Sequence, residues 1–197
     1  MPTRSSTLPE SYRSTPDAEL LSQFFKPDQV ATLQANPTGL RGLFGRPATS
    51  RGGRQLLAAT ELIRRATLAE LQGEMLTTPE MTQAYLVRHF FGRTFEVFAV
   101  MYLDNRHRLI AVADVFRGTI DGASVHPREI VRDAIAHNAA AVILAHNHPS
   151  GVAEPSQADE LITRRLKEAL LLVEIRILDH IVVAGGLCVS MAQTGRL

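Results

Sequence analysis

Residues 146–159 read HNHPSGVAEPSQAD, and this run indicates both the local fold and its chemistry. The apolar run Ala141–Ala145 before it predicts a short buried strand. Side chains two positions apart on a strand share a face, so His146 and His148 are expected to face one point. The prolines and the glycine that follow predict a loop after the strand.

The loop leads into a helical pattern over residues 158–173. Ser156 is expected to cap this helix, which places Asp159 in its first turn with its carboxylate able to turn back toward the histidines. Two imidazole nitrogens and one carboxylate oxygen suit zinc better than calcium or magnesium. Three protein ligands would leave a fourth position open for water, as hydrolytic zinc sites do. The sequence therefore predicts Zn²⁺ bound by His146, His148 and Asp159.

Ordinary structural explanations exist for each part of this pattern. Ser156 and Asp159 also fit a plain helix-capping pair, and a histidine near a strand end is most often structural. The combination of both histidines, the loop-forming residues and the carboxylate at this spacing favours a metal site.

The spacing His146-x-His148, then Ser156 and Asp159, resembles the JAMM (JAB or MPN+) metalloprotease motif, and HNHPSG…PS…D resembles its RadC branch. The resemblance continues at Met101–Asp104, Val131–Ala134 and Leu178–Ile181 and spans residues 94–195. It implies an α/β fold, namely a JAB/MPN-type, cytidine-deaminase-like domain with a mixed sheet and flanking helices. It also implies a zinc-dependent hydrolase that cleaves a peptide or isopeptide bond in a peptide or protein substrate.

The resemblance assigns two further catalytic residues. Glu96 occupies the place of the glutamate that moves protons between water and the leaving amine. Ser156 occupies the place of a hydroxyl that binds the developing oxyanion. The residues themselves leave alternatives open, because Glu96 also fits the exposed side of a strand and Ser156 also fits a helix cap.

The chain divides into three predicted parts. Residues 1–16 are expected to be a disordered tail, residues 17–92 a helical N-terminal region, and residues 93–197 the catalytic domain. In the helical region the pattern predicts a helix over Arg54–Leu71, with Leu57, Leu62, Ile63 and Ala66 on its apolar face, and another that starts at Pro79 after the cap Thr78 and ends near Gly92. In the catalytic domain it predicts strands over 94–103, 108–116, 141–145, 175–183 and 187–191, and a helix over 127–138.

The N-terminal region carries a local basic stretch. Residues 29–60 contain no acidic residue, and Arg46, Arg51 and Arg54 are candidate DNA contacts. RadC relatives carry a helix-hairpin-helix here, but residues 44–54 lack its usual Gly-x-Gly spacing, so at most a degenerate form around Gly52-Gly53 is expected. The alternative is a solvated loop with incidental arginines.

Composition limits the class of protein. The chain has 197 residues, 45% hydrophobic residues, a net charge of +1 and one cysteine, which excludes an internal disulfide. No apolar run approaches the roughly 20 residues of a membrane helix, and residues 1–17 lack the apolar stretch of a signal peptide, so a cytoplasmic location is expected. The sequence specifies neither the substrate nor the oligomeric state.

The remaining histidines are expected to be secondary. Neighbours on a strand face opposite sides, so Asp179 and His180 are unlike a ligand pair, and a structural role or a hydrogen bond to a ligand histidine fits better. His89, His107, His126 and His137 are expected at the surface or at helix ends. Two alternatives to the hydrolase stay open: a DNA-associated accessory or repair protein with a structural or vestigial zinc site, and a metal-dependent nuclease.

Overall fold

A computed structural model describes residues 15–36, 43, 50–72, 78–118 and 125–197. The chain forms two compact units, Met1–Glu61 and Leu62–Leu197, and each is described here by itself. The predicted disordered tail falls almost entirely outside the described residues, as does Arg46.

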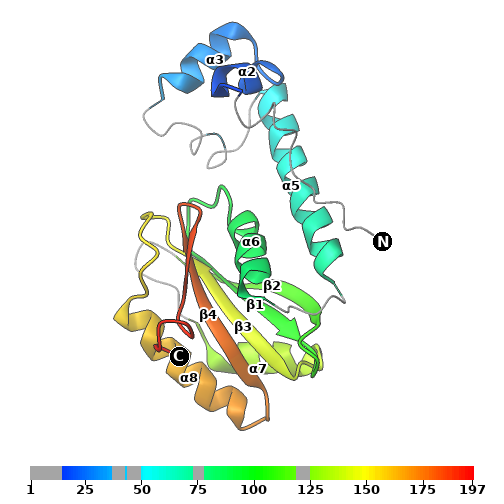
Figure 1. Cartoon of the computed structure of the whole chain (residues 1–197), viewed down its shortest axis with the longest axis vertical. Coiled ribbons are helices and arrows are strands. Elements are labelled where there is room, and N and C mark those ends of the chain that lie inside the picture. The colour runs from blue at the N-terminus through cyan, green and yellow to red at the C-terminus, as the bar shows by residue number, and fades with distance from the viewer. Residues whose placement is uncertain (1–14, 37–42, 44–49, 73–77, 119–124) are drawn as a thin grey trace. The chain divides into compact units, whose positions relative to one another are not determined.

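A five-stranded mixed sheet forms the centre of the second unit (Figure 1). The strand order is β2-β1-β3-β4-β5, with bounds β1 Val97–Leu103, β2 Leu109–Arg117, β3 Ala141–Asn147, β4 Arg176–Ala184 and β5 Leu187–Ser190. β3 and β4 are parallel and are joined through the helix α8, Gln157–Leu171, while the other neighbours are antiparallel. The predicted mixed α/β fold with flanking helices is confirmed.

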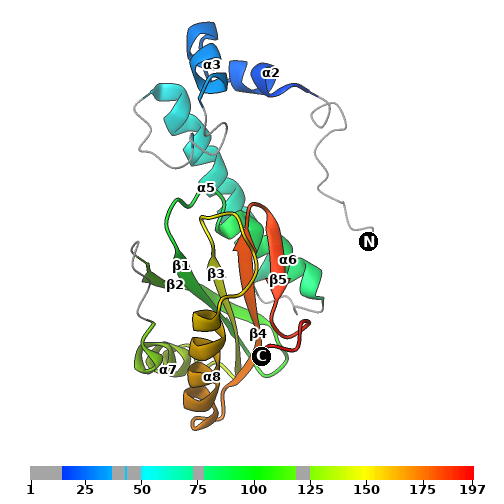
Figure 2. The ribbon, with the colours of Figure 1, turned by 90° about the vertical axis from the view of Figure 1, so that its left-hand side faces the viewer.

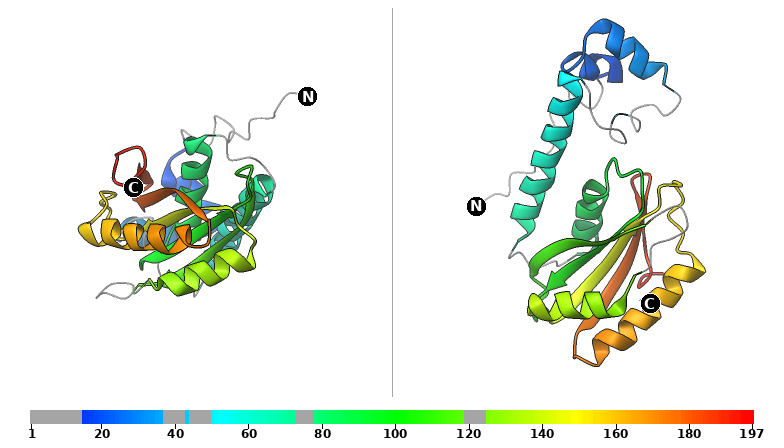
Figure 3. Two further views of the ribbon diagram at one scale, coloured as in Figure 1. Left: turned by 90° about the horizontal axis from the view of Figure 1, so that it is seen from below. Right: turned by 180° about the vertical axis from the view of Figure 1, so that it is seen from behind.

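Both faces of this sheet are covered, which explains why β1 and β3 are buried at every position. In β1, Val97, Ala99 and Met101 pack in one core together with the helix α6, Pro79–His89. The alternate residues Phe98, Val100 and Tyr102 pack in a second core under α8 and under α7, Pro127–Ala136. Figure 3 shows α6 on one face and α7 and α8 on the other, and Figure 2 shows α7 and α8 next to each other.

Helix α6 belongs to the unit that contains the sheet, although the sequence pattern assigned it to the region 17–92. Its Tyr85 and Leu86 are fully buried against the sheet, and Thr78 caps it as predicted. His89 ends the helix as expected but is buried, because its Nε2 lies 2.6 Å from Oδ1 of Asp114 on β2. Sequence spacing gives no sign of that partner, which lies 25 residues away.

Several boundaries differ from prediction by a few residues. β1 begins at Val97 instead of Thr94, β2 covers Leu109–Arg117, and α6 ends at His89 instead of near Gly92. α7 ends at Ala136, and the left-handed conformation of Asn138, with φ 50°, stops it there.

In the first unit, α2 (Asp17–Ser22), α3 (Pro27–Gln34) and the start of α5 (Arg51–Leu71) surround a small core of Leu21, Phe25 and Val30. α5 begins three residues before the predicted Arg54. Its predicted apolar face is wrong at Leu62 and Ile63, which are 66% and 59% exposed.

Gly52 and Gly53 lie in the first turn of α5 and are buried, and residues 44–49 before them lie outside the described residues, so a degenerate hairpin here stays a prediction. A Cβ on Gly52 would lie 1.9 Å from the carbonyl oxygen of Phe24, so the glycine lets the two backbones approach closely. Arg51 and Arg54 are exposed on the same turn, and their contact with DNA stays a prediction. None of the described helices combines the length and the apolar character needed to cross a membrane.

Gly52→Ala should destabilise the first unit by about 1–3 kcal/mol because the added Cβ forces the backbone at Phe24 to move. A glycine-to-alanine change inside a helix normally stabilises by roughly 0.5–1 kcal/mol, so the sign itself is diagnostic. Hydrogen exchange of the α2 and α3 amides measures the effect. Slower exchange in the variant than in the parent would show that the close approach is absent.

Candidate metal centre

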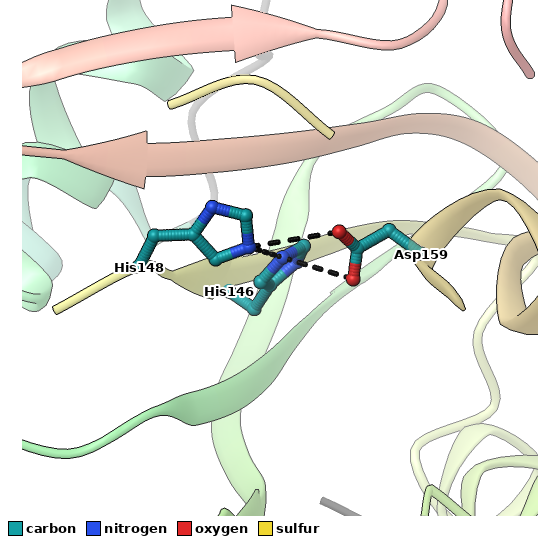
Figure 4. Close-up of side chains that lie close together, drawn as sticks. All are labelled: His146, His148 and Asp159. Atoms are coloured by element: carbon teal, nitrogen blue, oxygen red, sulfur yellow. Dashed lines mark hydrogen bonds and ion pairs between the residues drawn. The ribbon is translucent and has the colours of Figure 1, made fainter. Parts of the chain in front are cut away.

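The end of β3 brings two histidine side chains together. His146 lies within the strand and is 1% exposed, and His148 follows the strand directly. A backbone hydrogen bond from His148 N to Val183 O, 2.8 Å long, keeps the chain beside β4. The two imidazoles face one another with 2.9 Å between their Nε2 atoms, as the two-residue strand period predicts (Figure 4).

The first turn of α8 supplies Asp159. Ser156 is the N-cap: its Oγ accepts a hydrogen bond from Asp159 N, 3.2 Å away, which confirms the predicted cap. In return, the Ser156 backbone N–H and hydroxyl both donate to Oδ2 of Asp159, at 2.7 and 2.6 Å. The carboxylate held in this way lies 3.2 Å from His146 Nε2 through Oδ1 and 3.6 Å from His148 Nε2 through Oδ2.

The second ring nitrogen of each histidine is already occupied. Gly151, at φ 88°, donates its N–H to His148 O and closes a tight turn. That turn brings Val152 O within 2.8 Å of His148 Nδ1, which must donate because a carbonyl only accepts. In His146, Nδ1 contacts His180 Nε2 at 2.8 Å. Both rings therefore present Nε2 toward Asp159.

The electrostatics at this point favour a positive charge. Burial of Asp159 opposes its ionisation, but its contacts with the side chains of His146, His148 and Ser156 outweigh burial and hold the pKa of its carboxyl far below the usual range. The hydrogen bond to Asp159 raises the pKa of His148 against the opposing effect of burial, and the Val152 carbonyl and the charge of Glu96 add to the rise. Burial lowers the pKa of His180 well below its usual value.

The candidate ligand atoms of His146, His148 and Asp159 all lie within 4.8 Å of one another, close enough to hold one metal ion. Two imidazole nitrogens and a carboxylate oxygen that converge in this way are compatible with a metal site. The donor types match those of zinc sites that keep one position open.

Glu96 lines the same cavity, of about 540 Å³, as His148, Ser156 and Asp159. It is half-buried and stands directly before β1, so the expectation that it lies inside the strand is wrong. The strand starts one residue later because the buried amide of Asn147 contacts the backbone on both sides of Glu96. Asn147 Nδ2 donates to Phe95 O at 3.0 Å, and its Oδ1 accepts from Val97 N at 2.8 Å.

The rest of the cavity wall is mainly apolar, with a cationic side chain on α8. These residues are Phe98, Val125, Ala158, Leu161 and Ile162, together with His126 and Arg165. Their place in the site is not predictable from the sequence, because they come from segments whose proximity depends on the fold. The contacts of Asn147 with the backbone beside Glu96 were likewise not predictable, because they depend on the pairing of β1 with β3.

Comparison with known proteins agrees with this geometry. The model of the family described as RadC-like JAB domain matches residues 76–196. A protein from Nitrosococcus oceani named UPF0758 protein is 61% identical over 144 residues, which cover 73% of this chain and 64% of that relative. UPF0758 proteins from Halorhodospira halophila and Alcanivorax borkumensis are 47% and 46% identical and cover 92% and 98% of this chain, and 89% and 94% of their own lengths. This chain belongs to the RadC-like JAB domain family.

Proposed function

We propose that this protein is a zinc-dependent hydrolase of the JAMM type that cleaves a peptide or isopeptide bond. At the level of the family, the JAB domain supports a metal-dependent hydrolase. The observation that carries the finer proposal is the group His146, His148 and Asp159, of which His148 and Asp159 line one cavity with Glu96. A carboxylate outside the ligand group is what proton transfer during hydrolysis requires.

His146, His148 and Asp159 would hold the ion. When bound, zinc supplies a Lewis acid that polarises the scissile carbonyl and lowers the pKa of a coordinated water to roughly 7. Glu96 takes a proton from the attacking water and passes it to the leaving amine. The mainly apolar walls around Phe98 and Leu161 exclude bulk water and accept the side chains of a peptide.

Ser156 would bind the oxyanion in this scheme, but its hydroxyl already has a hydrogen-bond partner. Its hydroxyl hydrogen points to Oδ2 of Asp159, so the residue holds a ligand in place. Binding of the oxyanion by Ser156 would require the hydroxyl to turn away from Asp159 as the substrate carbonyl arrives.

His148→Ala should abolish stoichiometric zinc binding, because two of three ligands cannot hold the ion tightly. Mass spectrometry of the purified protein should find about one zinc per chain in the parent and none in the variant. His107→Asn is the matched control, since His107 lies outside the ligand group. Equal zinc content in the parent and His148→Ala would overturn the ligand assignment.

Zinc affinity should fall as the pH decreases through the raised pKa of His148. In the metal-free protein that pKa lies above 6.5, so at lower pH the ion must displace a proton from the ring.

The raised pKa of His148 also means that the His148–Asp159 contact stabilises the metal-free fold fully below about pH 6.5 and progressively less as the pH rises through the folded pKa. For Asp159 the lowered pKa gives a contribution present above the ordinary 3.8 and lost only as the pH falls toward the folded value.

Competition titrations with a chelator of known affinity, from about pH 5 to about pH 8, measure the zinc dependence. A zinc dissociation constant that does not change across this range would contradict the proton displacement.

Glu96→Gln should retain zinc and lose hydrolysis by about 10²–10⁴-fold, because the amide cannot move the proton. Hydrolysis is measured on a library of internally quenched peptides and isopeptide-linked peptides, with zinc content determined on the same samples. Glu168→Gln, an exposed position on α8, is the control. Full activity in Glu96→Gln would remove Glu96 from the mechanism. Cleavage of DNA without cleavage of peptides, lost in Asp159→Ala, would favour a nuclease instead.

A further inference from the structure

Behind the candidate ligands lie two fully buried polar residues that neither the ligand group nor the proposed mechanism uses. His180 comes from β4 and contacts His146 through its Nε2. Thr163 comes from α8, one helical turn after Asp159, and its Oγ1 lies 2.6 Å from Nδ1 of His180. The three side chains form one chain of hydrogen bonds from α8 through β4 to β3.

The direction of this chain follows from the single hydrogen of the Thr163 hydroxyl. Oγ1 also contacts the backbone carbonyl oxygen of Asp159. A carbonyl has no hydrogen to give, so the hydroxyl hydrogen must lie between Thr163 and Asp159. In the contact between Thr163 and His180 the hydroxyl oxygen therefore accepts, and Nδ1 of His180 carries the hydrogen and donates it.

Counting hydrogens in the same way determines whether the next two ring nitrogens, Nε2 of His180 and Nδ1 of His146, carry a proton. A neutral imidazole has one N–H, so a proton on Nδ1 leaves Nε2 of His180 as an acceptor. The 2.8 Å contact with His146 therefore places a proton on His146 Nδ1. Nε2 of His146 is left with a free lone pair, and this is the nitrogen that faces Asp159 and His148.

We propose that Thr163 and His180 are positioning residues that fix the tautomer of His146 and so keep its Nε2 available to a metal ion. This inference rests on the proposed metal site and extends it to residues without contact to the ligand atoms of Asp159 and His148. A histidine ligand commonly donates its other N–H to a neighbouring acceptor, which orients the ring and strengthens the metal bond. Here a neutral histidine is that acceptor, and Thr163 sets its tautomer.

A doubly protonated His180 would reverse this arrangement. Both of its nitrogens would then donate, His146 would carry its proton on Nε2, and no lone pair would face the metal. The surroundings oppose that state, because the ring is fully buried and lies against the edge of Phe98, with ring centres 5.4 Å apart. Among the described residues the ring nitrogens of His180 contact His146 and Thr163 and no carboxylate oxygen, so a charge there would be buried without a directly hydrogen-bonded anion.

Thr163 also joins the two ligand-bearing elements. It donates to the carbonyl of Asp159 on α8 and, through His180, determines the ring of His146 on β3. A change at Thr163 thus affects, through the side chain of His180, whether Nε2 of His146 is available to a metal ion.

The matched variants are Thr163→Val, which keeps the shape and removes the hydroxyl, and Thr163→Ser, which keeps the hydroxyl. Thr163→Val removes the acceptor for His180 Nδ1–H, so binding a metal would leave that N–H buried and unpaired. We expect zinc to bind about 10–100-fold more weakly in Thr163→Val, and close to the parent value in Thr163→Ser. Thr82→Val, a buried threonine of α6 in the other core, controls for a general loss of stability.

Two measurements separate this inference from the proposed function. Long-range ¹H–¹⁵N spectra of the metal-free parent report the tautomers directly, and both His146 and His180 should carry their proton on Nδ1. Titration with zinc and a competing chelator then gives the affinities of the variants. Both protons on Nδ1 together with weakened binding only in Thr163→Val would support the proposal.

A proton on Nε2 of His146 in the parent, or equal zinc affinity in Thr163→Val and Thr163→Ser, would overturn the proposal. If the parent binds no zinc, the proposed function fails, while the spectra still decide whether Thr163 and His180 set the tautomer.

Discussion

The convergence of three electron-rich atoms at the end of β3 is the constraint on which the rest of the site depends. Nε2 of His146, Nε2 of His148 and the Asp159 carboxylate face one another at distances of 2.9, 3.2 and 3.6 Å. Such an arrangement is stable only if a proton or a metal cation lies among them and if the backbone prevents them from moving apart. The surrounding contacts meet the second condition: strand pairing holds His146, a backbone bond to Val183 holds His148, and the capping box holds Asp159.

The same strand end also places the candidate general base. Asn147 sits between the two histidines and points to the opposite side, as the strand period requires. Its amide continues the β1–β3 pairing with side-chain bonds to Phe95 and Val97, beyond the last pair Phe98–His146. Glu96 lies between these two anchored residues, and Gly118 N donates to its carbonyl at 2.8 Å. β3 and the residue directly after it therefore carry two candidate ligands and position the candidate general base.

The parts of the site that are close in sequence were predictable, and the parts that depend on distant pairing were not. The strand, turn and helix-cap rules locate His146, His148, Ser156 and Asp159 because all four lie within fourteen residues. The role of Asn147 depends on the β1–β3 register, and that of Thr163 depends on how α8 lies against β4. Gly52 also could not be placed from local sequence alone. Glycine is typical of turns, but Gly52 lies in the first turn of a helix, where its close approach to the backbone of Phe24 explains it. The burial of His89 likewise follows from Asp114 on a strand whose position no local pattern reveals.

Asp179 and His180 show how two adjacent positions of one strand make contacts on opposite sides of the sheet. His180 turns inward to His146, whereas Asp179 accepts bonds from the Ser190 hydroxyl and from Ala192 N and so holds the chain after β5. That segment leads to Arg196, which contacts Pro155 O and pairs with Glu154, in the loop just before the cap Ser156. The loop between β3 and α8, which connects the candidate ligands, is thus held from within by the contact of His148 with Val152 and from outside by Arg196. Because a loop with partners on both sides loses little further freedom when it binds an ion, this bracing favours a preorganised centre over one that forms only on binding.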